Sequence, residues 1–93
     1  MGSTSNCRRF RVTGRVQGVF FRAWTEEQAE RLRVNGWIVN CPDGSVEAHL
    51  EGEEGAVNWL IDLIGEGPPS ARVAKVQVRE AEVEGSTKFE VRH

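Results

Sequence analysis

The chain has 93 residues, of which 39% are hydrophobic and 28% charged, and its formal net charge is −2. This length suffices for one hydrophobic core, so we expect a flexible segment over residues 1–6 and one domain over residues 7–93. The slightly acidic balance provides no chain-wide positive field for a nucleic acid backbone or an anionic membrane. The longest apolar run is too short to cross a bilayer, and the first residues lack the apolar centre of a signal peptide. We therefore expect a cytoplasmic protein.

The hydrophobic pattern predicts secondary structure in the order βαββαβ, followed by a short final strand. Alternation predicts a strand over residues 7–13, which ends at Gly14. Helical spacing follows over residues 21–34, with Asn35-Gly36 as the C-terminal stop. The remaining predicted elements are a hairpin of residues 37–40 and 45–51, a helix over residues 53–64, and strands over residues 73–78 and 88–92.

This order favours an α+β fold, the ferredoxin-like sandwich, in which one mainly antiparallel sheet carries two helices on one face. A crossover helix joins the first two strands, so these strands run parallel and end at the same edge of the sheet. Gly14 and Asn40 then share that edge, roughly 10 Å apart if the hairpin's return strand lies between them. Cys7 and Cys41 fall at opposite ends of the two strands, and we expect two ordinary thiols that form neither a metal cluster nor a disulfide.

The segment between the first strand and the first helix is a candidate phosphate-binding loop. Gly14 and Gly18 stand four residues apart in it, and it leads directly into a helix N-terminus. Backbone N–H groups in such a turn can converge on an anion, and the helix dipole adds positive potential. The spacing matches neither the Walker A pattern nor Gly-x-Gly-x-x-Gly. A tight strand-to-helix turn also explains two glycines, so the loop alone leaves both interpretations open.

Two polar residues strengthen the case for a site at this edge. Arg22 falls in the first helical turn, where a cation opposes the helix dipole, so either a bound anion or an ion pair with Glu26 accounts for it. Asn40 precedes a Pro-Asp-Gly turn, where asparagine is common, and its carboxamide can also orient a water molecule. We expect no catalytic role for His49, on the outer face of a strand, or for His93, at the end of the chain.

These residues carry a resemblance to a known family. The runs Gly14-Arg-Val-Gln-Gly-Val-Phe-Phe-Arg22 and Gly36-Trp-Ile-Val-Asn40, followed by Asp43-Gly-Ser-Val-Glu47, closely resemble the signatures of acylphosphatases. The likeness extends over most of the chain. It implies a metal-independent hydrolase without cofactors, which cleaves the carboxyl–phosphate bond of an acyl phosphate to a carboxylate and inorganic phosphate. The sequence leaves the oligomeric state open, and we take a monomer as the default expectation.

The resemblance also implies roles for individual residues. In that family the arginine matching Arg22 and the backbone amides of the loop bind the phosphate, and the asparagine matching Asn40 positions the attacking water. Arg22 and Asn40 are therefore the predicted catalytic residues. The predicted substrate-binding residues are Arg15, Val16, Gln17, Gly18, Val19, Phe20 and Phe21. Departures from the usual family pattern occur at Arg33-Val34, Val39 and His93, none of which removes a group with a catalytic role.

Two noncatalytic interpretations of the same fold stay open at this point. An RNA-binding module would stack bases on aromatic side chains of the open sheet face. The predicted outer positions, which carry no aromatic pair, are Arg9, Arg11, Glu47, His49 and Glu51. A phosphate sensor would bind phosphate through the loop without turnover. Hydrolysis is favoured because the chain carries both Arg22 and Asn40. Its chemistry needs no general acid, since an acyl phosphate releases a weakly basic carboxylate and positioning and charge stabilisation suffice.

Overall fold

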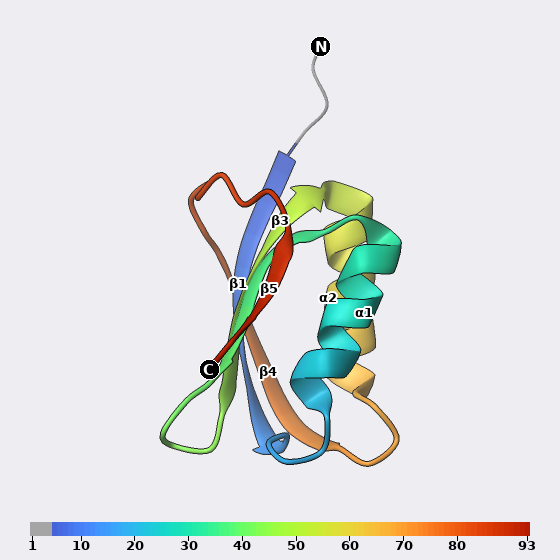
Figure 1. Cartoon of the computed structure of the whole chain (residues 1–93), viewed down its shortest axis with the longest axis vertical. Coiled ribbons are helices and arrows are strands. Elements are labelled where there is room, and N and C mark those ends of the chain that lie inside the picture. The colour runs from blue at the N-terminus through green and yellow to red at the C-terminus, as the bar shows by residue number, and fades with distance from the viewer. Residues whose placement is uncertain (1–4) are drawn as a thin grey trace.

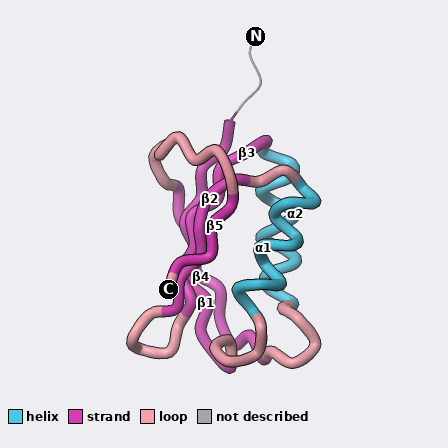
Figure 2. Tube along the Cα trace, viewed as in Figure 1, coloured by secondary structure: helices cyan, strands magenta, loops and turns pink. Residues whose placement is uncertain are grey.

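The computed structural model describes residues 5–93, and the two helices and five strands in this part of the chain follow the predicted order. They are β1 (Ser5–Arg15), α1 (Phe21–Leu32), β2 (Asn35–Asn40), β3 (Val46–Glu53), α2 (Glu54–Glu66), β4 (Arg72–Glu80) and β5 (Phe89–Arg92). Both helices lie side by side on one face of a single sheet, so the ferredoxin-like α+β fold is confirmed (Figure 1; Figure 2). Residues 1–4 of the expected N-terminal segment lie outside the described residues, and β1 already begins at Ser5.

The strands lie in the order β4-β1-β3-β2-β5. β3 pairs antiparallel with both β1 and β2, which makes β1 and β2 parallel to each other, as predicted. Val46 of β3 pairs with Val12 on one side and with Asn40 on the other. The loop after β1 and the turn after β2 therefore leave the sheet at the same end of the molecule (Figure 1).

The predicted end of the first helix was wrong. α1 ends at Leu32, and Arg33 takes the left-handed conformation with φ 59°. The N–H of Val34 then donates to the carbonyl of Ala29 at 2.8 Å, and the Val34 side chain returns to the core, 1% exposed. A left-handed residue that closes the last turn is the usual helix C-cap, here formed by arginine instead of glycine.

The expected stop, Asn35-Gly36, instead begins β2. Gly36 has φ 141°, and a Cβ at this position would collide with the backbone carbonyl of His49 on β3. The glycine is thus explained by the close approach of two strands and not by a helix end.

The core fills the space between the sheet and the helices. Val57, Leu60 and Ile64 of α2 are fully buried, whereas Trp59 of the same helix has 63% of its surface exposed. On α1 the buried residues are Phe21, Thr25 and Ala29, which follow one another at intervals of four residues and so share one face of the helix. Neither helix, among the residues described, is long and apolar enough to cross a membrane.

The face of the sheet that points away from the helices, here called the outer face, is covered at one end by residues 81–88, which are hydrogen-bonded to Trp37 and Glu51. His49 lies beneath this cover and is fully buried. Trp37, which the predicted list of outer positions missed, stacks on His49 with ring centroids 6.0 Å apart. The guanidinium groups of Arg9 and Arg92 lie 5.1 and 4.8 Å from the Trp37 ring centroid, and only 8% of the tryptophan is exposed.

Glu51 anchors this covering segment. Its carboxylate accepts hydrogen bonds from the backbone N–H groups of Glu84 and Ser86, and its Oε2 lies 2.6 Å from Nε2 of His49. Burial alone would raise the pKa of Glu51, but these hydrogen bonds together hold the pKa below its ordinary value. The carboxylate is therefore charged at neutral pH and stabilises the folded chain in that form.

We expect Glu51→Gln to lower the free energy of unfolding at pH 7 by about 1–3 kcal/mol, because a buried charged acceptor is lost. A depressed folded-state pKa contributes stability above the unfolded value of about 4.3, and this contribution is lost as the pH falls through the folded-state pKa. The difference in the free energy of unfolding between wild type and Glu51→Gln, measured by urea denaturation, should thus be smaller at pH 3 than at pH 7. The exposed Glu53→Gln variant is the control, and an equal Glu51→Gln effect at both pH values contradicts this account.

Candidate active site

The loop between β1 and α1 turns on two glycines with positive φ. Gly14 has φ 122° and lies at a β-bulge, where a Cβ would collide with the carbonyl of Arg72 and lie 2.7 Å from the backbone N of Ala74. Gly18 has φ 72° with open space around it. Both glycines are therefore explained by backbone geometry, and that geometry shapes the segment 16–20 into a compact turn.

Apolar side chains fix the loop to the core. Val16 is 1% exposed and Val19 is 7% exposed, so both side chains are buried beneath the turn. The Ser70 hydroxyl donates to the carbonyl of Val19 at 3.1 Å from the segment that precedes β4. The two valine side chains point inward, whereas Gly18, which lies between them in the sequence, and Phe20, which follows Val19, are exposed.

Gln17 ties the loop to the turn after β2. Its Nε2 donates to the backbone carbonyls of Cys41 and Ser45, at 2.9 and 2.8 Å. Cys41 directly follows Asn40, so the amide of one loop side chain bridges the two segments that carry the candidate site. The role of the Gln17 side chain is thus structural, whatever its backbone N–H binds.

The N-terminus of α1 offers hydrogen-bond donors. Phe20 is the N-cap residue, with φ 62° and ψ 24°, and its carbonyl accepts a hydrogen bond from the N–H of Trp24 at 2.9 Å. No side chain caps the helix among the residues described, and its first turn contains no acidic residue. The first N–H groups of the helix are therefore available to an anion and carry the positive end of the dipole.

Arg22 projects from this first turn toward the end of β5. Its Nη1 donates to the carbonyl of Arg92 at 2.6 Å and lies 3.4 Å from Nδ1 of His93. Within residues 5–93 no ion pair joins Arg22 to Glu26, the alternative that the sequence left open. The guanidinium is thus held by a neutral carbonyl and keeps its charge uncompensated.

Asn40 ends β2 opposite Val46. Its Oδ1 is buried and has no hydrogen-bond partner among residues 5–93. Buried polar atoms in folded proteins nearly always have a partner, so an orphan acceptor indicates a place for a water molecule or a ligand.

Arg22 and Asn40 line one hollow of about 320 Å³. The other residues that line it are Val16, Gly18, Phe20, Phe21, Ala23, Val91 and His93. Of the predicted site residues, Arg15, Gln17 and Val19 do not line the hollow: Arg15 is exposed at the end of β1, Gln17 braces the neighbouring turn and Val19 is buried. The sequence did not predict that Ala23, Val91 and His93 line the hollow. Val91 and His93 lie there because β5 pairs with β2, and this long-range pairing is the signal that would have placed them.

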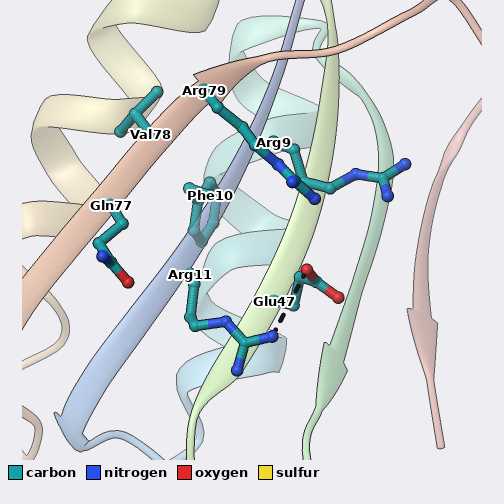
Figure 3. A pocket seen from close by; sticks show the side chains of 7 residues that line it. All are labelled: Arg9, Phe10, Arg11, Glu47, Gln77, Val78 and Arg79. Carbon is teal, nitrogen blue, oxygen red and sulfur yellow. Dashed lines mark ion pairs between the residues drawn. The ribbon is translucent and has the colours of Figure 1, made fainter.

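A second hollow, of about 380 Å³, lies on the outer face of the sheet (Figure 3). Two of its arginines are already matched by carboxylates. Arg11 lies 3.0 Å from Asp43 and 3.8 Å from Glu47, and Arg9 lies 2.6 Å from Glu84. The local charges largely cancel, so this hollow is a weaker anion site than the one beside Arg22.

The structure also brings Cys7, His49 and Glu51 together, with one potential ligand atom of each within 4.8 Å of the others. Burial raises the pKa of the Cys7 thiol, and the charges of Glu51 and Glu84 raise it further. Nδ1 of His49 is buried without a partner among residues 5–93, so a metal on Nε2 would leave a buried N–H without an acceptor. The cluster therefore fits an anchor for the covering segment better than it fits a metal site.

Comparison with known proteins identifies the family to which this chain belongs. The acylphosphatase family model matches residues 8–91. An acylphosphatase of Rubrobacter xylanophilus is 55% identical over 95 residues, covering 99% of this chain and 86% of that protein. An acylphosphatase structure from Coxiella burnetii superposes with a TM-score of 0.91 at 40% identity and covers 95% of this chain and 93% of its own. One from Bacillus subtilis gives 0.91 at 33% identity, with 97% and 100% covered. The chain belongs to the acylphosphatase family of enzymes, which hydrolyse acyl phosphates to a carboxylate and inorganic phosphate.

Proposed function

We propose that this acylphosphatase works by direct attack of water on phosphorus, with Arg22 and the amides of residues 15–21 holding the phosphoryl group and Asn40 positioning the water. The observation that carries this mechanism is the shared hollow of Arg22 and Asn40 beside an uncapped helix N-terminus. A cation, free amide donors and an orphan acceptor are the groups that a phosphate and a water molecule require.

Arg22 supplies the permanent charge of the site. The guanidinium has five N–H donors and stays protonated at any working pH. One nitrogen is hydrogen-bonded to the carbonyl of Arg92, which fixes the side chain while other donors remain for phosphate oxygens. The same donors stabilise the charge that spreads over the equatorial oxygens during transfer.

Asn40 would orient the water and not deprotonate it. Its Oδ1 can accept a hydrogen from the water, and this bond directs an oxygen lone pair toward phosphorus. The loose character of phosphoryl transfer places little demand on a strong base, so orientation in line with the departing carboxylate is the main contribution. The carboxylate leaves without protonation because it is a weak base.

The RNA-binding alternative receives no support from the outer face. Trp37 is the aromatic residue on that face, and Arg9 and Arg92 lie over its ring. No second aromatic side chain lies near it among the described residues except His49, which is buried beneath it.

A monomeric state and a cytoplasmic location stay predictions of the sequence.

Replacing Arg22 should remove both binding and turnover. We expect Arg22→Ala to lower kcat by about 10²–10³-fold and to weaken inhibition by inorganic phosphate, because a charged donor to the transferred group is lost. Arg22→Lys should recover only part of the activity, since an ammonium group cannot bind two phosphate oxygens in the bidentate geometry of a guanidinium. The exposed Arg31→Ala variant on the same helix is the control, measured with benzoyl phosphate. Wild-type phosphate inhibition in Arg22→Ala would disprove the assignment.

Replacing Asn40 should separate turnover from binding. We expect Asn40→Ala to lower kcat by about 10²-fold or more, while the inhibition constant of phosphate stays within about twofold, because only water orientation is lost. Asn58→Ala, an exposed change on α2, controls for the general effect of removing an asparagine. A wild-type rate in Asn40→Ala is the result that rejects the water-positioning role.

Chelation should leave the rate unchanged. Arg22 and the loop amides supply the positive charge that a metal ion would otherwise provide, so turnover after prolonged treatment with EDTA should equal that of the untreated enzyme. Steady-state hydrolysis of benzoyl phosphate in metal-depleted buffer provides the measurement. If the rate falls and a divalent cation restores it, the proposed mechanism lacks a component.

A further inference from the structure

Phe20 is the most exposed large apolar residue in the described chain, with 82% of its surface accessible. Exposed single hydrophobic residues are common, but this one lies in the turn that leads into the candidate site. Its position therefore calls for a reason beyond chance exposure.

The backbone makes the choice of phenylalanine more unusual. Phe20 is in the left-handed region at φ 62°, which glycine, asparagine and aspartate occupy with less strain. Its carbonyl accepts the N–H of Trp24, so the helix start holds it in this conformation. A glycine or asparagine would relieve the strain and avoid the exposed ring, so the aromatic side chain offers no advantage to folding at this position.

The location of Phe20 supplies a use for the ring. It lines the hollow of Arg22 and Asn40, and it also borders a neighbouring hollow along α1 with Ala23 and Trp24. Phe20 thus forms the wall between the phosphate site and the adjoining helix surface. A substrate held by its phosphoryl group at Arg22 places its acyl group near the other residues that line the hollow, and the exposed ring of Phe20 is the largest apolar surface that they offer.

We propose that Phe20 is a specificity-determining residue whose ring packs against the acyl group of the substrate and favours acyl phosphates with an apolar, uncharged acyl group. This inference rests on the proposed function of the same hollow and adds the class of substrate. Aromatic rings pack best against other aromatic or aliphatic groups in offset or edge-to-face contact, so an aroyl phosphate gains more than an acetyl phosphate. The free enzyme holds the ring exposed and ready for this contact.

The test compares kcat/KM for benzoyl phosphate and acetyl phosphate in wild type, Phe20→Ala and Phe20→Leu. We expect Phe20→Ala to lower the benzoyl-to-acetyl ratio by about fivefold to tenfold, mainly through a higher KM for benzoyl phosphate. Phe20→Leu, which keeps apolar surface, should lower the ratio by only about twofold to threefold. Trp59→Ala removes another exposed aromatic residue, 63% exposed on α2, and should leave the ratio unchanged. Inhibition by inorganic phosphate in each variant reports on the phosphate site itself.

With an active wild type, two results for the Phe20→Ala variant overturn the inference. A benzoyl-to-acetyl ratio that stays within twofold of wild type in Phe20→Ala shows that the ring does not contact the acyl group. Equal loss on both substrates, together with weaker phosphate inhibition, shows that Phe20 only shapes the loop. If wild type hydrolyses neither substrate, the proposed function fails along with the inference, whereas an active wild type with an unchanged ratio in Phe20→Ala defeats the inference alone.

Discussion

The whole site depends on β3 lying between β1 and β2. This pairing forces the two outer strands of the trio to run parallel, so the segments that follow them emerge at one edge of the sheet. The space between them is two strand spacings, and Gln17 bridges it with hydrogen bonds to the carbonyls of Cys41 and Ser45. The candidate phosphate-binding loop and Asn40, which are distant in sequence, thus become neighbours at this edge of the sheet.

The chemistry of the substrate explains why so few groups suffice. An acyl phosphate already contains a good leaving group, and its transfer calls mainly for charge stabilisation and alignment. In the mechanism that we propose, fixed donors at a helix N-terminus, one guanidinium and one carboxamide meet this demand without any side chain that must change its protonation state. The buried His49 and Glu51 serve the stability of the covering segment instead, on the opposite face of the sheet from the helices.

Local sequence patterns predicted the order of the elements, the parallel strands β1 and β2, and the positions of Gly14, Arg22 and Asn40 at the ends of elements. These features could be predicted because hydrophobic periodicity and turn residues are local, and because crossover connections between parallel strands follow general rules. The proposed roles of Arg22 and Asn40 came from the resemblance, since the residue pattern alone was also explained by an ion pair for Arg22 and by a turn for Asn40. What the sequence could not predict depends on long-range pairing. Trp37 is covered by residues far along the chain, and His93 reaches the site only because β5 pairs beside β2.

Hydrolysis of benzoyl phosphate in ¹⁸O-labelled water under single-turnover conditions tests most directly whether water attacks phosphorus. The site holds its cation, its amide donors and its orphan acceptor around one hollow, so the attacked atom should be the one that Arg22 binds. This account predicts the label in inorganic phosphate and none in benzoate, as analysed by mass spectrometry of both products. Label in benzoate would show that water attacks the acyl carbon, and it would contradict the assignment of Asn40 to a water aligned on phosphorus.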